Sequence, residues 1–287
     1  MSRVAPVEWF TAVFAVAYGL LIWLIGGSGP AVEGWLVVDV GLAGAALVGL
    51  PLLRRARSPV LQYLGVGLPM LAFYIIYRQS PLALSQTHGA WHEATIATLD
   101  RQFVPRLATT PPEVVREWLA FSYLTYIPIL VGGTAALFGL TARGVDAPAE
   151  RTVRQVCLAL ASCYVVFVCY PVLSPRFTEP SLQAARLGAG IFSRLAVLNQ
   201  QHGMVHGDSF PSAHLAATVV VLTALYESRR VLFWGLLPIA VSLSVGAVYF
   251  GYHYVTDVLA GAGVGFVAVG IDRWRMSKRA TAPWAGG

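Results

Sequence analysis

Two histidines near the end of the chain stand in settings that could do chemistry, and the first is His253. It lies in the segment GYHYVTD at residues 251–257, in which Asp257 follows four residues later. On a helix this spacing makes the two side chains face each other. A carboxylate that holds one imidazole nitrogen protonated leaves the other with a free lone pair, which is the arrangement of a nucleophile. Taken alone, such a pair is better explained as an ion pair at a helix end.

The second histidine is His214, which ends the segment FPSAH at residues 210–214. We expect this segment to open a helix, and a helix N-terminus presents unpaired N–H groups and a positive dipole end that suit an anion. Pro211 has no N–H to lose there, and Ser212 can add a hydroxyl donor. His214 would lie one turn into the helix, where it can donate a proton to the bound anion.

A metal site is the main alternative for the neighbouring polar residues. His202, His206 and Asp208 precede His214 and could form a ligand set with it, but their spacing matches no zinc pattern. A polar loop that roofs a pocket explains them better. We therefore expect no metal and no cofactor.

Two further groups of metal-type residues are explained without a metal. His92 and Glu93 do not form the zinc-protease helix pattern, because Ile96 stands where a second histidine is needed. The three cysteines are spaced six residues apart within one apolar segment, so they share no helix face. They are interpreted as small apolar helix residues.

The composition places these motifs in a membrane protein. Hydrophobic residues make up 56% of the chain and charged residues 12%, with a mean hydropathy of +0.64. Soluble domains carry about 25% charged residues. The net charge of +6 comes from basic clusters at the ends of apolar segments, which membrane topology explains and nucleic-acid binding does not.

Eight apolar stretches are long enough to cross a hydrocarbon core of about 30 Å. They cover residues 7–27, 32–53, 59–77, 118–140, 155–174, 212–227, 231–250 and 255–274. The prediction is an all-α integral membrane protein in which residues 1–58 form two N-terminal transmembrane helices. Residues 59–279 would form a six-helix catalytic domain, and residues 280–287 a cytoplasmic tail.

The basic residues predict the orientation of these spans. With the N-terminus inside, 13 of the 20 arginines and lysines fall at span ends on the inner side, and the other seven are spread over two long outer loops. The positive-inside rule then places both termini in the cytoplasm. All six histidines fall on the outer side, which makes the extracytoplasmic face of the cell membrane the expected site of the chemistry. With 19 arginines against one lysine, the composition indicates a GC-rich, bacterial genome.

The first long outer loop, residues 78–117, is expected to hold a helix that lies in the membrane interface. Its apolar stripe consists of Trp91, Ile96, Leu99, Phe103 and Leu107. Residues 110–113 (TPPE) then resemble a capping box that opens the fourth span.

Polar and small residues inside two of the spans raise structural questions. Asp39 lies mid-span, where it would be costly facing lipid, so it either pairs internally or lines a path. Gly261, Gly263 and Gly265 are interpreted as helix-packing positions, because they lie inside the last span.

The two histidine segments resemble the type 2 phosphatidic acid phosphatase superfamily. Its second motif is Pro-Ser-x-His, as in residues 211–214, and its third is a His-x-x-x-Asp preceded by Gly-x, as in residues 251–257. The resemblance covers the last five or six spans. It implies that His253 attacks phosphorus to give a phosphohistidine, that Asp257 orients His253, and that His214 protonates the leaving group and later deprotonates the acceptor.

The departures from that family's pattern narrow the range of expected substrates. The lysine of its first motif is missing, and Ala247 stands where many members have an arginine six residues before the third-motif histidine. Pro175 and Arg176 instead resemble the inositol phosphorylceramide synthase branch, which implies that Arg176 is the main cation for the phosphate, with Ser212 beside it. A phosphomonoester carries a charge near −2 at neutral pH and a diester −1, so a single arginine favours a diester lipid.

The function we expect is therefore phosphotransfer on a lipid-linked phosphate, leaning to transfer of a phospholipid head group to a lipid alcohol. A lipid phosphate or lipid pyrophosphate phosphatase, with water as acceptor, is the alternative. A transporter or scaffold that kept the helical bundle and lost catalysis is the alternative outside enzymes.

Overall fold

The computed structural model describes residues 4–85, 91–103, 110–139, 147–203 and 205–280. Within these ranges the chain is helical, and its only extended pairing is an isolated bridge between Val172 and Asp208. The prediction of an all-α integral membrane protein is confirmed.

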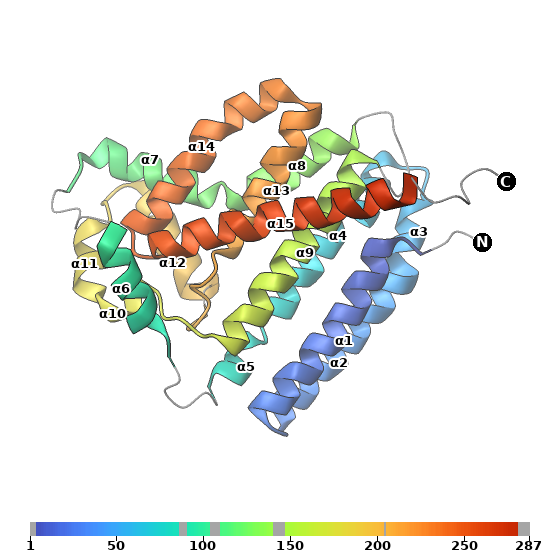
Figure 1. The fold of residues 1–287 in the computed structure, drawn as a ribbon, viewed down its shortest axis with the longest axis horizontal. Helices are drawn as coiled ribbons and strands as arrows, with labels where there is room; N and C mark the ends of the chain where they lie inside the picture. The colour runs from blue at the N-terminus through green and yellow to red at the C-terminus, as the bar shows by residue number, and fades with distance from the viewer. Residues whose placement is uncertain (1–3, 86–90, 104–109, 140–146, 204, 281–287) are drawn as a thin grey trace.

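The N-terminal part is a helical hairpin followed by a third long helix (Figure 1). Helix α1 (Pro6–Gly26) packs along α2 (Pro30–Gly44), which continues through one π-helical turn, η1 (Ala45–Gly49), into α3 (Leu50–Arg54). Helix α4 (Pro59–Tyr77) packs against α1 and α3. The predicted division after residue 58 thus falls at the turn between α3 and α4, although α1 also packs on α9 of the C-terminal part.

The C-terminal part contains the long helices that carry the histidine segments. Its members are α7 (Glu113–Leu124), α8 (Tyr126–Phe138), α9 (Pro148–Cys169), α13 (Ala213–Ser228), α14 (Arg230–Tyr249) and α15 (Val255–Ala280). Five short helices gather at the left and lower left of Figure 1: α5 (Ser80–Leu84), α6 (Glu93–Phe103), α10 (Pro175–Thr178), α11 (Pro180–Arg186) and α12 (Ile191–Gly203). The start of α1 and the end of α15 lie together at the opposite end of the molecule.

The count of eight spans is not reproduced. Six of the described helices, or continuous runs of helices, are long and apolar enough to cross a membrane, and a seventh is added if α7 and α8, bent by 51°, are one span. The predicted span at residues 212–227 corresponds to α13, whose 16 residues measure only about 24 Å. It starts deeper in the bundle than α15, because Ser212 lies beside Asp257 and Gly261, which are already inside α15.

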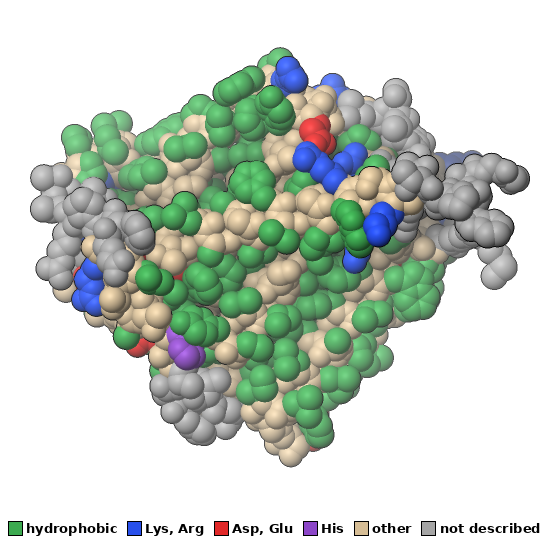
Figure 2. Space-filling view, in the orientation of Figure 1, with side chains coloured by type: hydrophobic (Ala, Val, Ile, Leu, Met, Phe, Trp, Pro, Cys, Tyr) green, Lys and Arg blue, Asp and Glu red, His purple; other side chains and the backbone are tan. Residues whose placement is uncertain are grey.

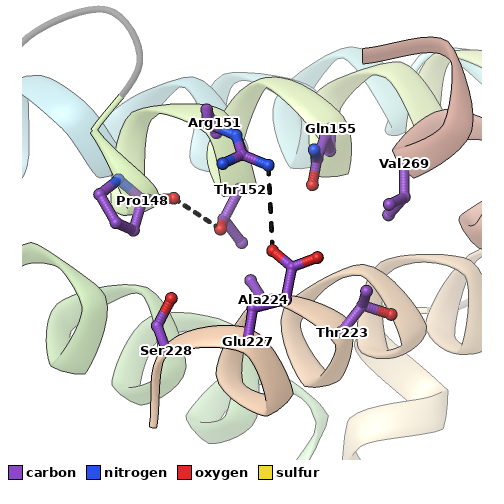
Figure 3. A pocket seen from close by; sticks show the side chains of 9 residues that line it. All are labelled: Pro148, Arg151, Thr152, Gln155, Thr223, Ala224, Glu227, Ser228 and Val269. Atoms are coloured by element: carbon purple, nitrogen blue, oxygen red, sulfur yellow. Dashed lines mark hydrogen bonds and ion pairs between the residues drawn. The ribbon is translucent and has the colours of Figure 1, made fainter. Parts of the chain in front are cut away.

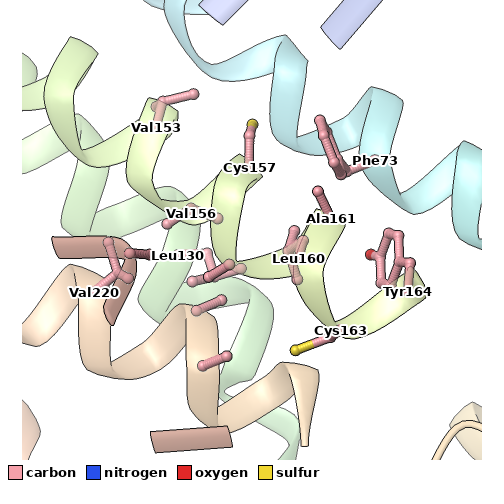
Figure 4. Packing of buried hydrophobic residues seen from close by; sticks show 14 of the residues in the cluster. Phe73, Leu130, Val153, Val156, Cys157, Leu160, Ala161, Cys163, Tyr164 and Val220 are labelled. Carbon is pink, nitrogen blue, oxygen red and sulfur yellow. The ribbon is translucent and has the colours of Figure 1, made fainter. Parts of the chain in front are cut away.

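Helix α9 forms the centre of the bundle. Two thirds of its apolar window is buried, whereas one third or less is buried in the other spanning helices. Its buried face presents Val153, Val156, Cys157 and Leu160 to the surrounding helices (Figure 4). The outer helices instead show apolar side chains over most of the face seen in Figure 2, as expected of a surface that contacts lipid.

Two of the three α15 glycines predicted to be packing positions allow close packing against α13. A Cβ at Gly261 would overlap with the carbonyl oxygen of Ser212, and one at Gly265 would lie 2.5 Å from that of Ala216. The packing prediction is wrong for Gly263, which faces open space because it lies on the other side of the helix.

Asp39 is paired inside the protein. Gln79 Nε2 donates a hydrogen bond of 2.9 Å to Asp39 Oδ1, and the carboxylate is almost fully buried. Gly19 of α1 makes room for it, since a Cβ there would overlap with Asp39 Oδ2. This pairing answers the question that the sequence left open.

Charged side chains cluster where α1 begins and α15 ends. Arg54 forms ion pairs with Glu8 and Glu150, and Asp272 forms ion pairs with Arg151 and Arg154. A small pocket lies there between the start of α9 and the end of α13, and its polar groups are paired with each other, as Figure 3 shows for Arg151 with Glu227. These contacts join helices at the end of the bundle away from the histidine segments.

The helix predicted in the first outer loop exists as α6, but its apolar side faces protein. Ile96 is buried against Val172 and Tyr254, and Leu99 is exposed. Leu107 lies outside the described residues. The capping box is wrong, because α7 begins at Glu113 without a side-chain cap.

Candidate active site

A tight turn after α14 positions His253. The backbone N–H groups of Tyr252 and His253 both donate to the carbonyl of Ala247, and Gly251 just before them has a φ of +71°. Glycine adopts this left-handed conformation without the strain that a side chain would impose. The carbonyl of Gly251 accepts a 2.9 Å hydrogen bond from Arg176 N, so the same turn brings α10 to the site.

The contacts of His253 define its tautomer. Its Nδ1 lies 2.9 Å from the carbonyl oxygen of Ser209. Because a carbonyl only accepts, Nδ1 carries the hydrogen and Nε2 keeps the lone pair. The ring is 3% exposed, and Nε2 has no hydrogen-bond partner among the residues that the structure describes.

Asp257 lies near His253 and also holds the residue that is hydrogen-bonded to it. His253 precedes α15, and its Nδ1 is 3.5 Å from Asp257 Oδ2, farther than from Ser209. Oδ2 accepts hydrogen bonds from Ser209 Oγ at 2.6 Å and from Tyr254 N at 2.8 Å. The carboxylate therefore holds Ser209, whose carbonyl in turn holds the imidazole. Sequence reasoning missed Ser209, although it directly precedes the FPSAH segment.

His214 meets His253 from a second helix. It lies in the first turn of α13, and the two imidazole centroids are 5.8 Å apart with the rings nearly edge to face. Tyr126 packs on the other side of His214 at 4.4 Å. Ser212 caps α13 by accepting from Leu215 N, which leaves the hydroxyl hydrogen of Ser212 available as a donor.

Arg176 lies in the short helix α10 and is 7% exposed. Its guanidinium stacks on Phe177 at 4.1 Å. Burial lowers the pKa of Arg176, and the nearby carboxylate of Asp208 opposes that shift. The structure thus places the expected cation next to the same turn that carries His253.

Asp208 is the charge that faces this cation. Tyr77 of α4 donates its hydroxyl to the carboxylate, and the bridge to Val172 fixes the backbone. Burial raises the pKa of Asp208, while the hydrogen bond from Tyr77 and the charge of Arg176 lower it. Asp208 belongs to the site itself and not to a roof over it.

Four side chains around the histidines lie deep in the protein and still keep accessible surface. They are His214, Tyr126, Tyr77 and Asp208. Partial exposure leaves these four side chains accessible, whereas the His253 ring beside His214 is buried.

The side chains of His206 and His92 do not join this cluster. His206 stacks on Phe177 with centroids 4.0 Å apart, and His92 stacks on Tyr170 at 3.9 Å. His88 and the side chain of His202 lie outside the described residues. Among the residues that are described, no three His, Cys, Asp or Glu side chains converge as metal ligands would.

Helix α6 and the residue before it contact the start of α15 and the loop after α9, which flank the candidate site. Asp100 Oδ1 accepts from both the backbone N and the hydroxyl of Thr256, at 2.9 and 3.1 Å, and so caps the start of α15. His92 N donates to the carbonyl of Pro171. The segment predicted to lie in the membrane interface thus packs, through α6, against the elements around the candidate site.

The comparison with protein families matches this arrangement. A family model described as the PAP2 superfamily matches residues 98–271, more than half of the chain. The chain belongs to the PAP2 superfamily. Comparisons with curated proteins and with solved structures found no match.

PAP2 membership makes the chain a membrane protein of the phosphatase type. The matched region begins in α6 and ends in α15, so it contains both histidine segments, Asp257 and Arg176. Tyr77 lies outside it, yet donates to Asp208. Helix α4, which precedes the matched region, therefore contributes a side chain next to Asp208.

Proposed function

We propose that this PAP2 protein transfers the phosphoryl group of a lipid-linked phosphate through a phosphohistidine at His253. The observation that carries the proposal is the hydrogen bond from His253 Nδ1 to the carbonyl of Ser209. It commits Nε2 to a lone pair, and Nε2 has no other described partner. A buried imidazole held in this tautomer is a nucleophile prepared in advance.

The reaction proceeds in two steps. In the first, Nε2 of His253 attacks phosphorus, the bond from phosphorus to the leaving oxygen breaks, and His214 gives that oxygen a proton. In the second, His214 takes the proton of the acceptor hydroxyl, the acceptor oxygen attacks phosphorus, and the bond to Nε2 breaks. Acid–base work of this kind contributes about 10²- to 10⁴-fold.

The charges around Arg176 favour a phosphodiester as donor. Arg176 is hydrogen-bonded through its backbone to the turn that carries His253, and Asp208 offsets part of its charge. The position of Ala247 adds no charge, since its side chain is buried in an apolar and aromatic cluster. Such a site matches the single negative charge of a diester better than the nearly double charge of a monoester. Transfer of a phospholipid head group to a lipid alcohol, as in inositol phosphorylceramide synthases, is the reaction that fits.

The test uses the purified full-length protein in mixed phospholipid vesicles, with and without ceramide or diacylglycerol. Head-group transfer that depends on the added alcohol supports the proposal. Release of phosphate into water without it identifies a lipid phosphate phosphatase instead, and no turnover with any donor supports a scaffold or transporter.

Trapping of a labelled phosphoenzyme tests the mechanism separately. The label should be absent in His253→Ala, and both its formation and its decay should be slower in His214→Gln. Full activity in His253→Ala would overturn the mechanism. Orthovanadate should inhibit turnover and a chelator should not; loss of activity with a chelator would point to a metal site instead.

The proposed orientation places both termini in the cytoplasm and the site on the extracytoplasmic face of a bacterial cell membrane. It is supported by the shared location of the start of α1 and the end of α15, away from the histidine segments. Reporter fusions to the C-terminus, one active only in the cytoplasm and one only outside it, test this. Activity of the outside reporter would contradict it.

A further inference from the structure

Two tyrosines next to the imidazoles have no evident structural use for their hydroxyl groups. Tyr123 of α7 and Tyr252 of the turn after α14 are 2% and 0% exposed. Their rings pack against each other with centroids 4.5 Å apart, and Tyr123 is 5.6 Å from His214. Neither hydroxyl has a hydrogen-bond partner among the described residues.

An unsatisfied buried hydroxyl is costly, and proteins rarely keep one without a reason. Here two of them lie side by side. Both are close enough to Arg176 for its charge to act on them, and Tyr123 is also within range of Asp208. The two tyrosines therefore lie in the electrostatic field of the cation expected to bind the phosphate.

Tyrosine hydroxyls differ from lysine or arginine in one respect that matters at this position. They donate hydrogen bonds to phosphate oxygens without adding positive charge. Burial raises the pKa of Tyr252 well above its ordinary value of 10, so it stays protonated and remains a donor. Two neutral donors and one arginine can solvate an anion with a single charge without overcompensating it.

We propose that Tyr123 and Tyr252 donate their hydroxyl hydrogens to the non-bridging oxygens of the phosphoryl group and, with Arg176, form its anion pocket. This inference rests on the proposed phosphoryl transfer at His253. It assigns the recognition of the phosphate to Tyr123, which lies outside both histidine segments, and to Tyr252, which directly precedes His253. It also explains how the site works without the lysine that the sequence lacks here.

The experiment compares Tyr123→Phe and Tyr252→Phe with Tyr249→Phe in the full-length protein. Tyr249 is a matched control, because it lies in the same buried cluster and its hydroxyl also lacks a described partner. Its charged neighbours, however, are Arg116 and Arg186 and not Arg176. The probe is orthovanadate, which mimics the phosphoryl group, and its binding is measured by titration.

Each of the two site variants should weaken vanadate binding by roughly 10- to 100-fold, the loss expected for one hydrogen bond to a charged group. The control should bind within about twofold of the wild-type protein. Thermal stability without vanadate should not fall in the site variants, because the removed hydroxyls have no partner to lose. A purely structural role would instead lower the thermal stability. Vanadate binding would then fall only as far as the fraction of folded protein falls.

The variant His253→Ala distinguishes a failure of the proposed phosphoryl transfer from a failure of the tyrosine pocket. If it still turns over lipid, the proposed function fails whatever the tyrosine variants do. If it is inactive while Tyr123→Phe and Tyr252→Phe bind vanadate as tightly as the control, only the tyrosine pocket is overturned.

Discussion

The imidazole of His253 donates from Nδ1 to the carbonyl oxygen of Ser209 over 2.9 Å, and the hydroxyl of the same serine donates to Asp257. Ser209 therefore stands between the two members of the expected pair and is held on both sides. Asp257 acts through it, at 3.5 Å from the imidazole nitrogen. The relay gives the carboxylate a positioning role that depends on a residue outside the two recognised motifs.

Removal of the relay should slow the chemistry while the protein stays folded. Ser209→Ala keeps the carbonyl but loses the hydroxyl that ties it to Asp257, so we expect kcat to fall roughly tenfold. Asp257→Asn should cost about 10²-fold or more, because the neutral amide accepts more weakly than the carboxylate and removes the negative charge 3.5 Å from His253 Nδ1. Rates of phosphoenzyme formation measure both. Equal rates in Ser209→Ala and wild type would show that the relay has no role.

Asp208 should control the charge of the preferred substrate. Asp208→Asn removes a negative charge near Arg176, so the ratio of kcat/KM for a monoester lipid to that for a diester lipid should rise, on the order of tenfold. Tyr77→Phe is the matched comparison. It removes only the hydrogen bond to Asp208 and should change the ratio less. A fall in the ratio for Asp208→Asn would contradict the charge argument.

The same variant should change how stability depends on pH. Burial raises the pKa of Asp208 above its ordinary 3.8, so between the two values the folded state binds more protons than the unfolded state. The stability contributed by the protonated form is thus present at low pH and is lost as pH rises through the folded-state pKa. Asp208→Asn does not titrate, and it should therefore gain stability relative to wild type as pH rises above about 4. Thermal unfolding in detergent checks this, and a difference that does not change with pH would count against it.

The close approach of α13 and α15 should be needed for activity. Gly261→Ala places a methyl group against the carbonyl of Ser212, whose own N–H donates to the carbonyl of Asp257 at 2.9 Å. The forced separation should displace His214 from His253 and lower kcat at least tenfold, since misplacement of about 1 Å can cost 10²-fold. Gly263→Ala is the control, because its added methyl group meets open space. Similar activity in the two variants would show that the helix contact is not required.

The buried pair of Asp39 and Gln79 should stabilise the N-terminal helices. Gly19→Ala would push a methyl group into the Asp39 carboxylate and should cost about 1–3 kcal/mol, the usual range for overpacking. Gly41→Ala, in α2 but facing open space, should cost nothing and serves as the control. Thermal unfolding of the two variants, with the same detergent, distinguishes them. A smaller loss for Gly19→Ala than for Gly41→Ala would show that the space around Asp39 can relax.

The amino-acid sequence by itself determined the membrane class, the positions of the long helices and the two segments that carry His214 and His253. These features are local. A run of about 20 apolar residues must form a helix in lipid, and a Pro-Ser pair before an apolar run marks a helix start wherever the rest of the chain lies. The number of spans was not determined in this way. Length alone does not reveal that α13 begins deeper in the bundle than α15, where Ser212 lies beside Asp257 of α15.

Only the tertiary structure decided which groups meet at the site. Ser209, Tyr123 and Tyr77 come from a loop and two different helices, and no spacing in the sequence links them to His253. Asp208 changed from a roof residue to the charge that faces Arg176 for the same reason. Side-chain partners across helices depend on how the helices pack, and packing is a property of the whole bundle and not of any one segment.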